Sequence, residues 1–224
     1  MVGKTRKAHT QALAQAPRDA IRVLVLTDKR YDIEFRTLSK FGQVAERKVV
    51  YQKTANRDLP NLKRADILWL GQGQLCESKY FLTREQENRI KAFVKNGGIV
   101  IVSGQDSDPE RSCDTGWLPE RLEGVERKHR QDFEPTRKAG TLFSTPNRVK
   151  SGRMAIDDTW TGWNDKYTIL ATTNGGKDIA AATLKHGKGM YLITGLQNET
   201  SGNISTNRRV MENLIHFAIE QLKR

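Results

Sequence analysis

Two short apolar runs, separated by a polar turn and a helical stretch, set the pattern in the middle of the chain. Residues 67–70 read Ile-Leu-Trp-Leu and residues 99–102 read Ile-Val-Ile-Val, and each run stops at a polar turn that contains glycine. Residues 83–97 open with a capping-box sequence, carry an apolar stripe at helical spacing and close on Gly97. This pattern predicts a strand–helix–strand unit with parallel strands and a right-handed crossover.

The same pattern continues on both sides of that unit. Apolar residues at helical spacing predict a helix over 30–41 and a final helix near the C-terminus, with Ser205 or Thr206 as its N-cap. Further apolar runs predict strands at 21–26, 44–51, 167–171, 179–184 and 190–194. Alternating strands and helices are typical of an α/β protein, and we expect a flavodoxin-like three-layer sandwich with a mainly parallel central sheet.

The chain divides into an arm and one domain. Residues 1–20 are basic and polar and predict a flexible N-terminal arm, whereas 21–224 predict a single domain. Within it, residues 107–147 are polar and contain several prolines, which predicts an irregular insertion. Short elements are expected in and after the insertion, namely a helix at 118–122 and strands at 142–143 and 154–156.

Composition adds a strong positive charge to this picture. The 224 residues carry a formal net charge of +12, and the mean hydropathy of −0.65 is that of a soluble globular protein. No apolar run approaches the roughly 20 residues of a membrane helix, so we expect a cytoplasmic protein with no membrane contact. Cys76 and Cys113 lack metal-ligand spacing and are expected to be free thiols. No cofactor is predicted.

The order of several weak motifs resembles a known family. The motifs are the strand and turn at 70–73, the helix end at 93–98, and the segments 156–160, 169–173, 187–191 and 195–197. Together they cover roughly residues 20–222 and resemble the class I glutamine amidotransferase-like superfamily, most closely its trehalose-utilisation (ThuA-like) branch. The resemblance implies the fold described above, with a site where the carboxyl ends of the strands meet.

The residues that carry chemistry in those relatives are missing here. An amidotransferase needs a Cys nucleophile on a strand-to-helix elbow, with a His base and a Glu that orients it. The matching elbow at 102–106 holds Ser103; Cys113 lies too far downstream, and Cys76 follows the wrong strand. The His positions of the ThuA-like branch are occupied by 103–105 and Gln197. We therefore expect no functional glutamine amidotransferase.

Polar side chains at the predicted strand ends are the candidate site. Amide groups both donate and accept hydrogen bonds, which suits a neutral polyhydroxylated ligand, and Trp160 is either a sugar-stacking ring or a lid or core aromatic. The candidate ligand-binding residues are Gln72, Gln74, Ser103, Gln105, Asp106, Asp157, Asp158, Trp160, Gln197 and Asn198. Ser103, Asp158 and Glu199 are the candidate catalytic residues, and Ser103 would need a base such as His129. The acidic residues nearby are more often solvated carboxylates than ligands, and no metal site is predicted.

Three functions remain open at this point. The first is a non-catalytic domain that binds a sugar-like or small polar ligand, a protein partner or a second copy of itself. The second is an enzyme that acts on a carbohydrate-like substrate through strand-end carboxylates. The third is a basic protein that associates with nucleic acid, although no nucleic-acid motif accompanies the charge.

Overall fold

The protein is described from a computed structural model. The residues described are 13, 16–27, 32–55, 59–76, 82–105, 113, 115–126, 132–152, 154–156 and 158–222. The strands are β1 (Ile21–Leu26), β2 (Gln43–Val44), β3 (Arg47–Thr54), β4 (Ile67–Leu70), β5 (Ile99–Val102), β6 (Glu123–Glu126), β7 (Glu134–Pro135), β8 (Asp158–Thr161), β9 (Tyr167–Thr173), β10 (Asp178–His186) and β11 (Gly189–Thr194). The α-helices of these residues are α2 (Asp32–Leu38), α3 (Arg84–Lys95) and α4 (Ser201–Gln221), and short 3-10 turns lie at Leu62–Arg64, Arg137–Ala139 and Asn174–Gly176.

The strands form one mixed sheet of two halves. Its order is β2-β3-β1-β4-β5-β11-β10-β8-β6, with β9 also paired to β10 and β7 paired to β9. Strands β3, β1, β4, β5 and β11 are parallel, as the sequence predicts, whereas β10, β8, β6, β9 and β7 pair antiparallel. The mainly parallel sheet is thus confirmed for one half only, and the fold is a mixed α/β fold.

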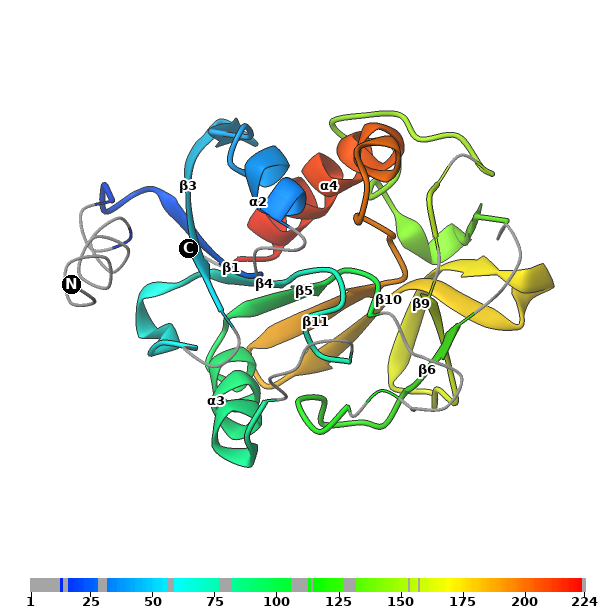
Figure 1. Cartoon of the computed structure of the whole chain (residues 1–224), viewed down its shortest axis with the longest axis horizontal. Coiled ribbons are helices and arrows are strands. Elements are labelled where there is room, and N and C mark those ends of the chain that lie inside the picture. The colour runs from blue at the N-terminus through cyan, green and yellow to red at the C-terminus, as the bar shows by residue number, and fades with distance from the viewer. Residues whose placement is uncertain are drawn as a thin grey trace.

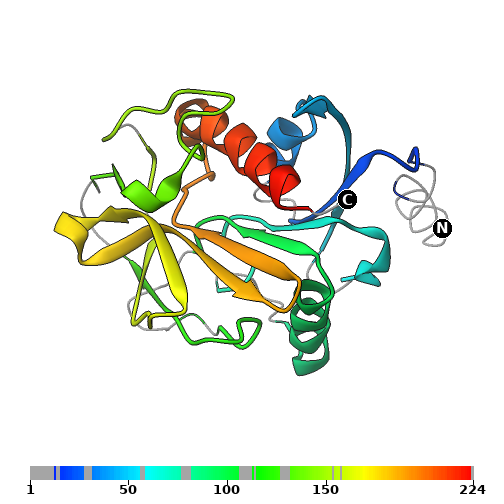
Figure 2. The same ribbon diagram turned by 180° about the vertical axis from the view of Figure 1, so that it is seen from behind.

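Helices cover the two faces of the parallel half. Helices α2 and α4 lie together on one face and α3 lies on the other (Figures 1 and 2). Successive side chains of a strand point to opposite faces, and β4 shows the result. Ile67 and Trp69 belong to the core cluster that includes α4, whereas Leu68 and Leu70 belong to the cluster that includes α3. Burial on both faces explains why the parallel strands read as continuous apolar runs.

The strand–helix–strand unit in the middle of the chain matches its prediction. The Thr83 hydroxyl accepts from the Gln86 backbone N–H, and the Gln86 side chain accepts from the Thr83 backbone N–H, which completes the capping box of α3. Gly97 follows the helix at a φ of 110°. The predicted strand at 44–51 instead divides into β2 and β3, because Ala45 and Glu46 adopt positive φ and form a tight hairpin turn.

Several short elements differ from the sequence prediction. Residues 118–122 form a bend and irregular chain and not a helix, and residues 142–143 lie in a turn. The expected strand at 154–156 is reduced to a single bridge between Ile156 and Leu196. Strands β6 and β7 of the insertion were not predicted, because their sequences are polar and carry no alternating pattern.

The last helix begins earlier than expected. Thr200, and not Ser205 or Thr206, is the N-cap of α4, because its hydroxyl accepts from the Asn203 backbone N–H at 3.2 Å. Most residues of the predicted N-terminal arm lie outside the described part of the chain. No helix within the described residues has the length and apolar character needed to cross a membrane.

Candidate functional site

A fully buried carboxylate lies where the parallel strands end. Glu34 of α2 points toward the ends of β4 and β5 and accepts four hydrogen bonds. Its Oε1 accepts from Ser103 Oγ at 2.5 Å, Asn198 Nδ2 at 2.7 Å and Trp69 Nε1 at 3.0 Å. Its Oε2 accepts from the Gln72 backbone N–H at 2.8 Å. One side chain therefore ties α2 to the ends of three strands.

The charge state of Glu34 reflects two opposing effects. Burial raises the pKa of the Glu34 carboxyl above its usual 4.5, because the ionised form loses its hydration. The hydrogen bonds from Ser103, Gln72, Asn198 and Trp69 lower the pKa, since they favour the ionised form, but they offset burial only in part. Four donors and full burial make this carboxyl a tightly held structural group.

The amide side chains of the strand ends extend the same network. Gln72 Oε1 accepts from the Asn198 backbone N–H at 3.1 Å. Gln105 Nε2 donates to the carbonyls of Gly71 and Ser103, and its Oε1 accepts from the Leu75 N–H. These amides therefore join the turns after β4, β5 and β11 to one another.

Two glycines allow the turns to approach this closely. A Cβ at Gly71 would lie 2.8 Å from Glu34 Oε2 and 2.7 Å from the Leu26 carbonyl oxygen. A Cβ at Gly104 would lie 2.9 Å from the Leu196 carbonyl oxygen, which accepts from the Gly104 N–H. Side chains at these positions would force the turns apart.

The structure brings together part of the predicted site. Gln72, Ser103, Gln105 and Asn198 meet in the network, at relative exposures of 0% or 1%. Gln74 is equally buried, and its Nε2 donates to the Gln72 carbonyl at 3.2 Å. A role for these five residues in ligand binding stays a prediction.

The other predicted residues lie apart from that network or outside the described chain. Trp160 is fully buried, donates from Nε1 to the Thr194 carbonyl and packs edge-on against Trp117. Asp158 is also buried, whereas Gln197 and Glu199 are half-buried. Asp106, Asp157 and His129 lie outside the described residues. Among the residues that the structure describes, no group of three or more His, Cys, Asp or Glu could hold a metal ion.

Sequence reasoning missed Glu34, the centre of the network. A glutamate in a short helix is usually a solvent-exposed residue, but Glu34 stands at helical spacing from Leu38 and Phe41, both buried. This spacing from two buried residues was the feature of the sequence that could have predicted the burial of Glu34. Asn207 and Asn213 of α4, both fully buried, were missed in the same way beside Val210 and Leu214.

The two cysteines correct a second expectation. They are not free thiols, because Cys76 and Cys113 form a disulfide with their Cα atoms 5.0 Å apart, within the usual range of about 4.4–6.8 Å. The bond links the turn after β4 to the insertion after β5. Neighbouring strands that end at one edge of the sheet bring the two residues together, which their separation of 37 in the sequence did not reveal.

A basic surface lies along the N-terminal half of α4. Two hollows, of about 840 and 780 Å³, flank the N-terminal half of this helix and share Ser205 and Arg209 in their linings. We call their six cationic residues the α4 basic face: Arg36, Lys40, Arg148, Lys150, Arg208 and Arg209. Among the residues that the structure describes, Glu212 is the only acidic one in either lining.

Comparisons with known proteins place the fold and not the function. No family model matches the chain, and no curated protein matches it. A solved structure of STM1381, described as a cytoplasmic protein of Salmonella typhimurium LT2, is 9% identical with a TM-score of 0.61, covering 91% of this chain and 100% of that one.

Two larger carbohydrate enzymes contain a similar fold. A cold-adapted β-galactosidase of Rahnella sp. R3 is 12% identical with a TM-score of 0.58, over 92% of this chain and 32% of that enzyme. Agd3, described as a carbohydrate deacetylase, is 11% identical with a TM-score of 0.58, over 90% of this chain and 32% of its own. The chain thus spans about a third of the length of these enzymes, and at these identities only the fold is shared.

Proposed function

We propose that this protein is a non-catalytic α/β domain that binds a ligand or a partner in a carbohydrate-related system. One observation carries the proposal: the polar groups at the strand ends, where a domain of this kind would hold its reactive residues, hydrogen-bond to one another inside the protein. The sequence resemblance to the glutamine amidotransferase-like superfamily fits a member that keeps the fold without its Cys and His.

The surroundings of Ser103 support this proposal. A nucleophilic serine needs a general base and a path for the substrate. Ser103 Oγ donates to Glu34 Oε1 and accepts from Asn198 Nδ2 at 3.3 Å, and its side chain is fully buried. The Ser103 hydroxyl thus both donates and accepts a hydrogen bond inside the network, which supports a structural role.

The carbohydrate setting rests on the fold neighbours. The β-galactosidase and the deacetylase each carry this fold as about a third of their length, so the fold occurs within larger enzymes that act on sugars. An attached domain of this kind contributes binding or assembly when it has no reactive group of its own. The alternative is a carbohydrate enzyme that uses Asp158 or Glu199 as acid and base.

Turnover measurements distinguish the two. We expect the purified chain to release no product from nitrophenyl glycosides, acetylated sugars or glutamine beyond the rate in buffer alone. Measurable turnover that is lost in Asp158→Asn or Ser103→Ala, with an unchanged circular dichroism spectrum and in contrast to exposed Ser39→Ala, would overturn the proposal in favour of an enzyme.

A further inference from the structure

We propose that the α4 basic face binds an acidic polysaccharide, a sugar chain that carries repeated carboxylate or sulfate groups. The inference rests on the binding role proposed above and adds to it a surface and a ligand class. It does not depend on the strand-end network, because Glu34, Ser103 and Asn198 line neither hollow, although Gln197, next to Asn198, lines one of them.

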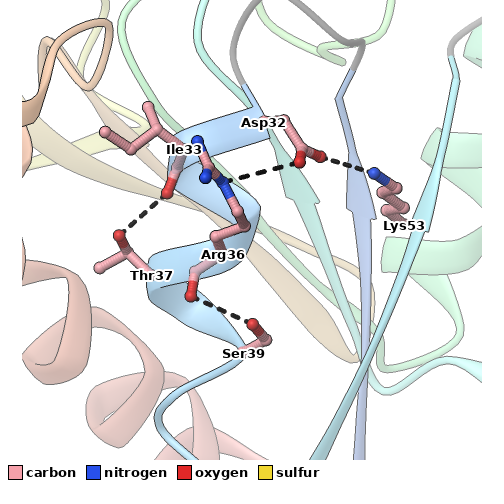
Figure 3. A network of polar contacts seen from close by, with 6 residues as sticks. All are labelled: Asp32, Ile33, Arg36, Thr37, Ser39 and Lys53. Carbon is pink, nitrogen blue, oxygen red and sulfur yellow. Dashed lines mark hydrogen bonds and ion pairs between the residues drawn. The ribbon is translucent and has the colours of Figure 1, made fainter.

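The charge of this face is nearly uncompensated. Against these six cations, the described residues of the two linings include one carboxylate, that of Glu212, whose Oε2 accepts from Asn147 Nδ2 at 3.0 Å. Within the described part of the chain, Arg36 alone of the six has a carboxylate partner, Asp32, at 3.7 Å. Asp32 is closer to Lys53, at 2.6 Å, as Figure 3 shows. The surface therefore attracts anions.

The cations are held on a fixed support. Asn213 Nδ2 donates to the carbonyls of Leu142 and Asn147, and Asn213 Oδ1 accepts from the Asn147 N–H. These bonds fasten the segment that carries Arg148 and Lys150 against α4, beside Arg209. A segment whose backbone is already in position loses less entropy on binding than a flexible one.

The shape of the face suits a chain more than a single small anion. Each hollow lies in the range of small-ligand sites, about 300–1,000 Å³. The two share Ser205 and Arg209 in their linings, so that a long ligand that crosses α4 at these residues would contact both. The hydroxyls of Ser205 and Thr206 are exposed there and can bond to sugar hydroxyls as well as to carboxylates.

Two observations favour a polysaccharide over nucleic acid. The described residues that line the two hollows include no Phe, Tyr or Trp, whereas single-stranded nucleic acids are bound largely by stacking of bases on aromatic rings. The Cys76–Cys113 disulfide also favours an oxidising compartment, where acidic glycans are common partners and nucleic acids are not.

Binding to matched polymers tests the inference. Calorimetry on the full chain would compare polygalacturonate and dextran sulfate with uncharged dextran and with a single-stranded DNA of equal charge number. We expect both acidic polysaccharides to bind and dextran not to bind. The double variant Arg208→Gln/Arg209→Gln should bind roughly tenfold more weakly, and Lys63→Gln/Lys177→Gln, which removes the same charge outside both hollows, should bind like the wild type.

Each other outcome overturns the inference. Tighter binding of the DNA would assign the face to nucleic acid, and equal weakening by both double variants would show that only net charge matters. Absence of binding to either acidic polysaccharide would remove the site altogether. None of these results bears on turnover, so a failure here leaves the non-catalytic assignment to its own test.

Discussion

At the scale of single residues, the buried Glu34 decides how the strand ends are held. Glu34 is fully buried, and it accepts four hydrogen bonds from strand β4 and from the turns that follow the strands. The sequence predicted three polar residues at the strand ends, and each of them contacts Glu34 or another of the three: Gln72, Ser103 and Asn198. The sequence indicated where the polar groups converge. It did not show that Glu34 of α2 accepts hydrogen bonds from several of them.

Glu34 should make stability depend on pH. Because burial raises its folded-state pKa above the usual 4.5, the folded protein holds this proton more tightly than the unfolded chain does. The stabilisation is therefore full below about pH 4.5 and declines as the pH rises through the folded pKa. We expect the unfolding free energy of the wild type, minus that of Glu34→Gln, to shrink in urea unfolding as the pH rises above about 4.5.

The opposite trend has a clear meaning. A difference that grows with pH would show that the four hydrogen bonds outweigh burial and hold the pKa of Glu34 below its usual value. Other titrating groups cancel in the comparison, since both proteins share them.

At the scale of elements, the sequence predicted strands and helices where apolar runs were long or periodic. Strands β1, β4, β5 and β11 and helix α3 carry such patterns and are confirmed. The start of α4 was misplaced because Thr200, Ser205 and Thr206 are all good N-cap residues, and only the fold selects among them. Strands β6 and β7 depend on pairing with distant strands, which a local pattern does not encode.

The cap of α4 can be tested with matched substitutions. Thr200→Ala removes the hydroxyl that accepts from the Asn203 N–H and should lower the free energy of unfolding by about 1 kcal/mol. Thr206→Ala is the control, because Thr206 lies exposed inside the helix, where alanine is the better helix former by a few tenths of a kcal/mol. Denaturant midpoints measure both. A larger loss in Thr206→Ala than in Thr200→Ala would place the helix start where the sequence alone put it.

At the scale of the whole molecule, the fold distinguishes two regions that the sequence did not distinguish. One is the strand-end network, closed by Glu34, Gln105 and the disulfide, and the other is the α4 basic face. The net charge of +12 suggested an anionic partner but gave no location. Its location depends on the contact of Asn213 with the insertion, which joins residues about 70 positions apart in the chain.

We interpret the polar groups at the strand ends as structural. The most direct measurement is the unfolding free energy of Ser103→Ala in urea, with exposed Ser39→Ala as the control. We predict a loss of about 1–3 kcal/mol for Ser103→Ala, because Glu34 and Asn198 lose a buried partner, and a change within about 0.5 kcal/mol for Ser39→Ala. A functional serine is often replaced without loss or with a gain of stability, so an unchanged or higher stability of Ser103→Ala would contradict the claim.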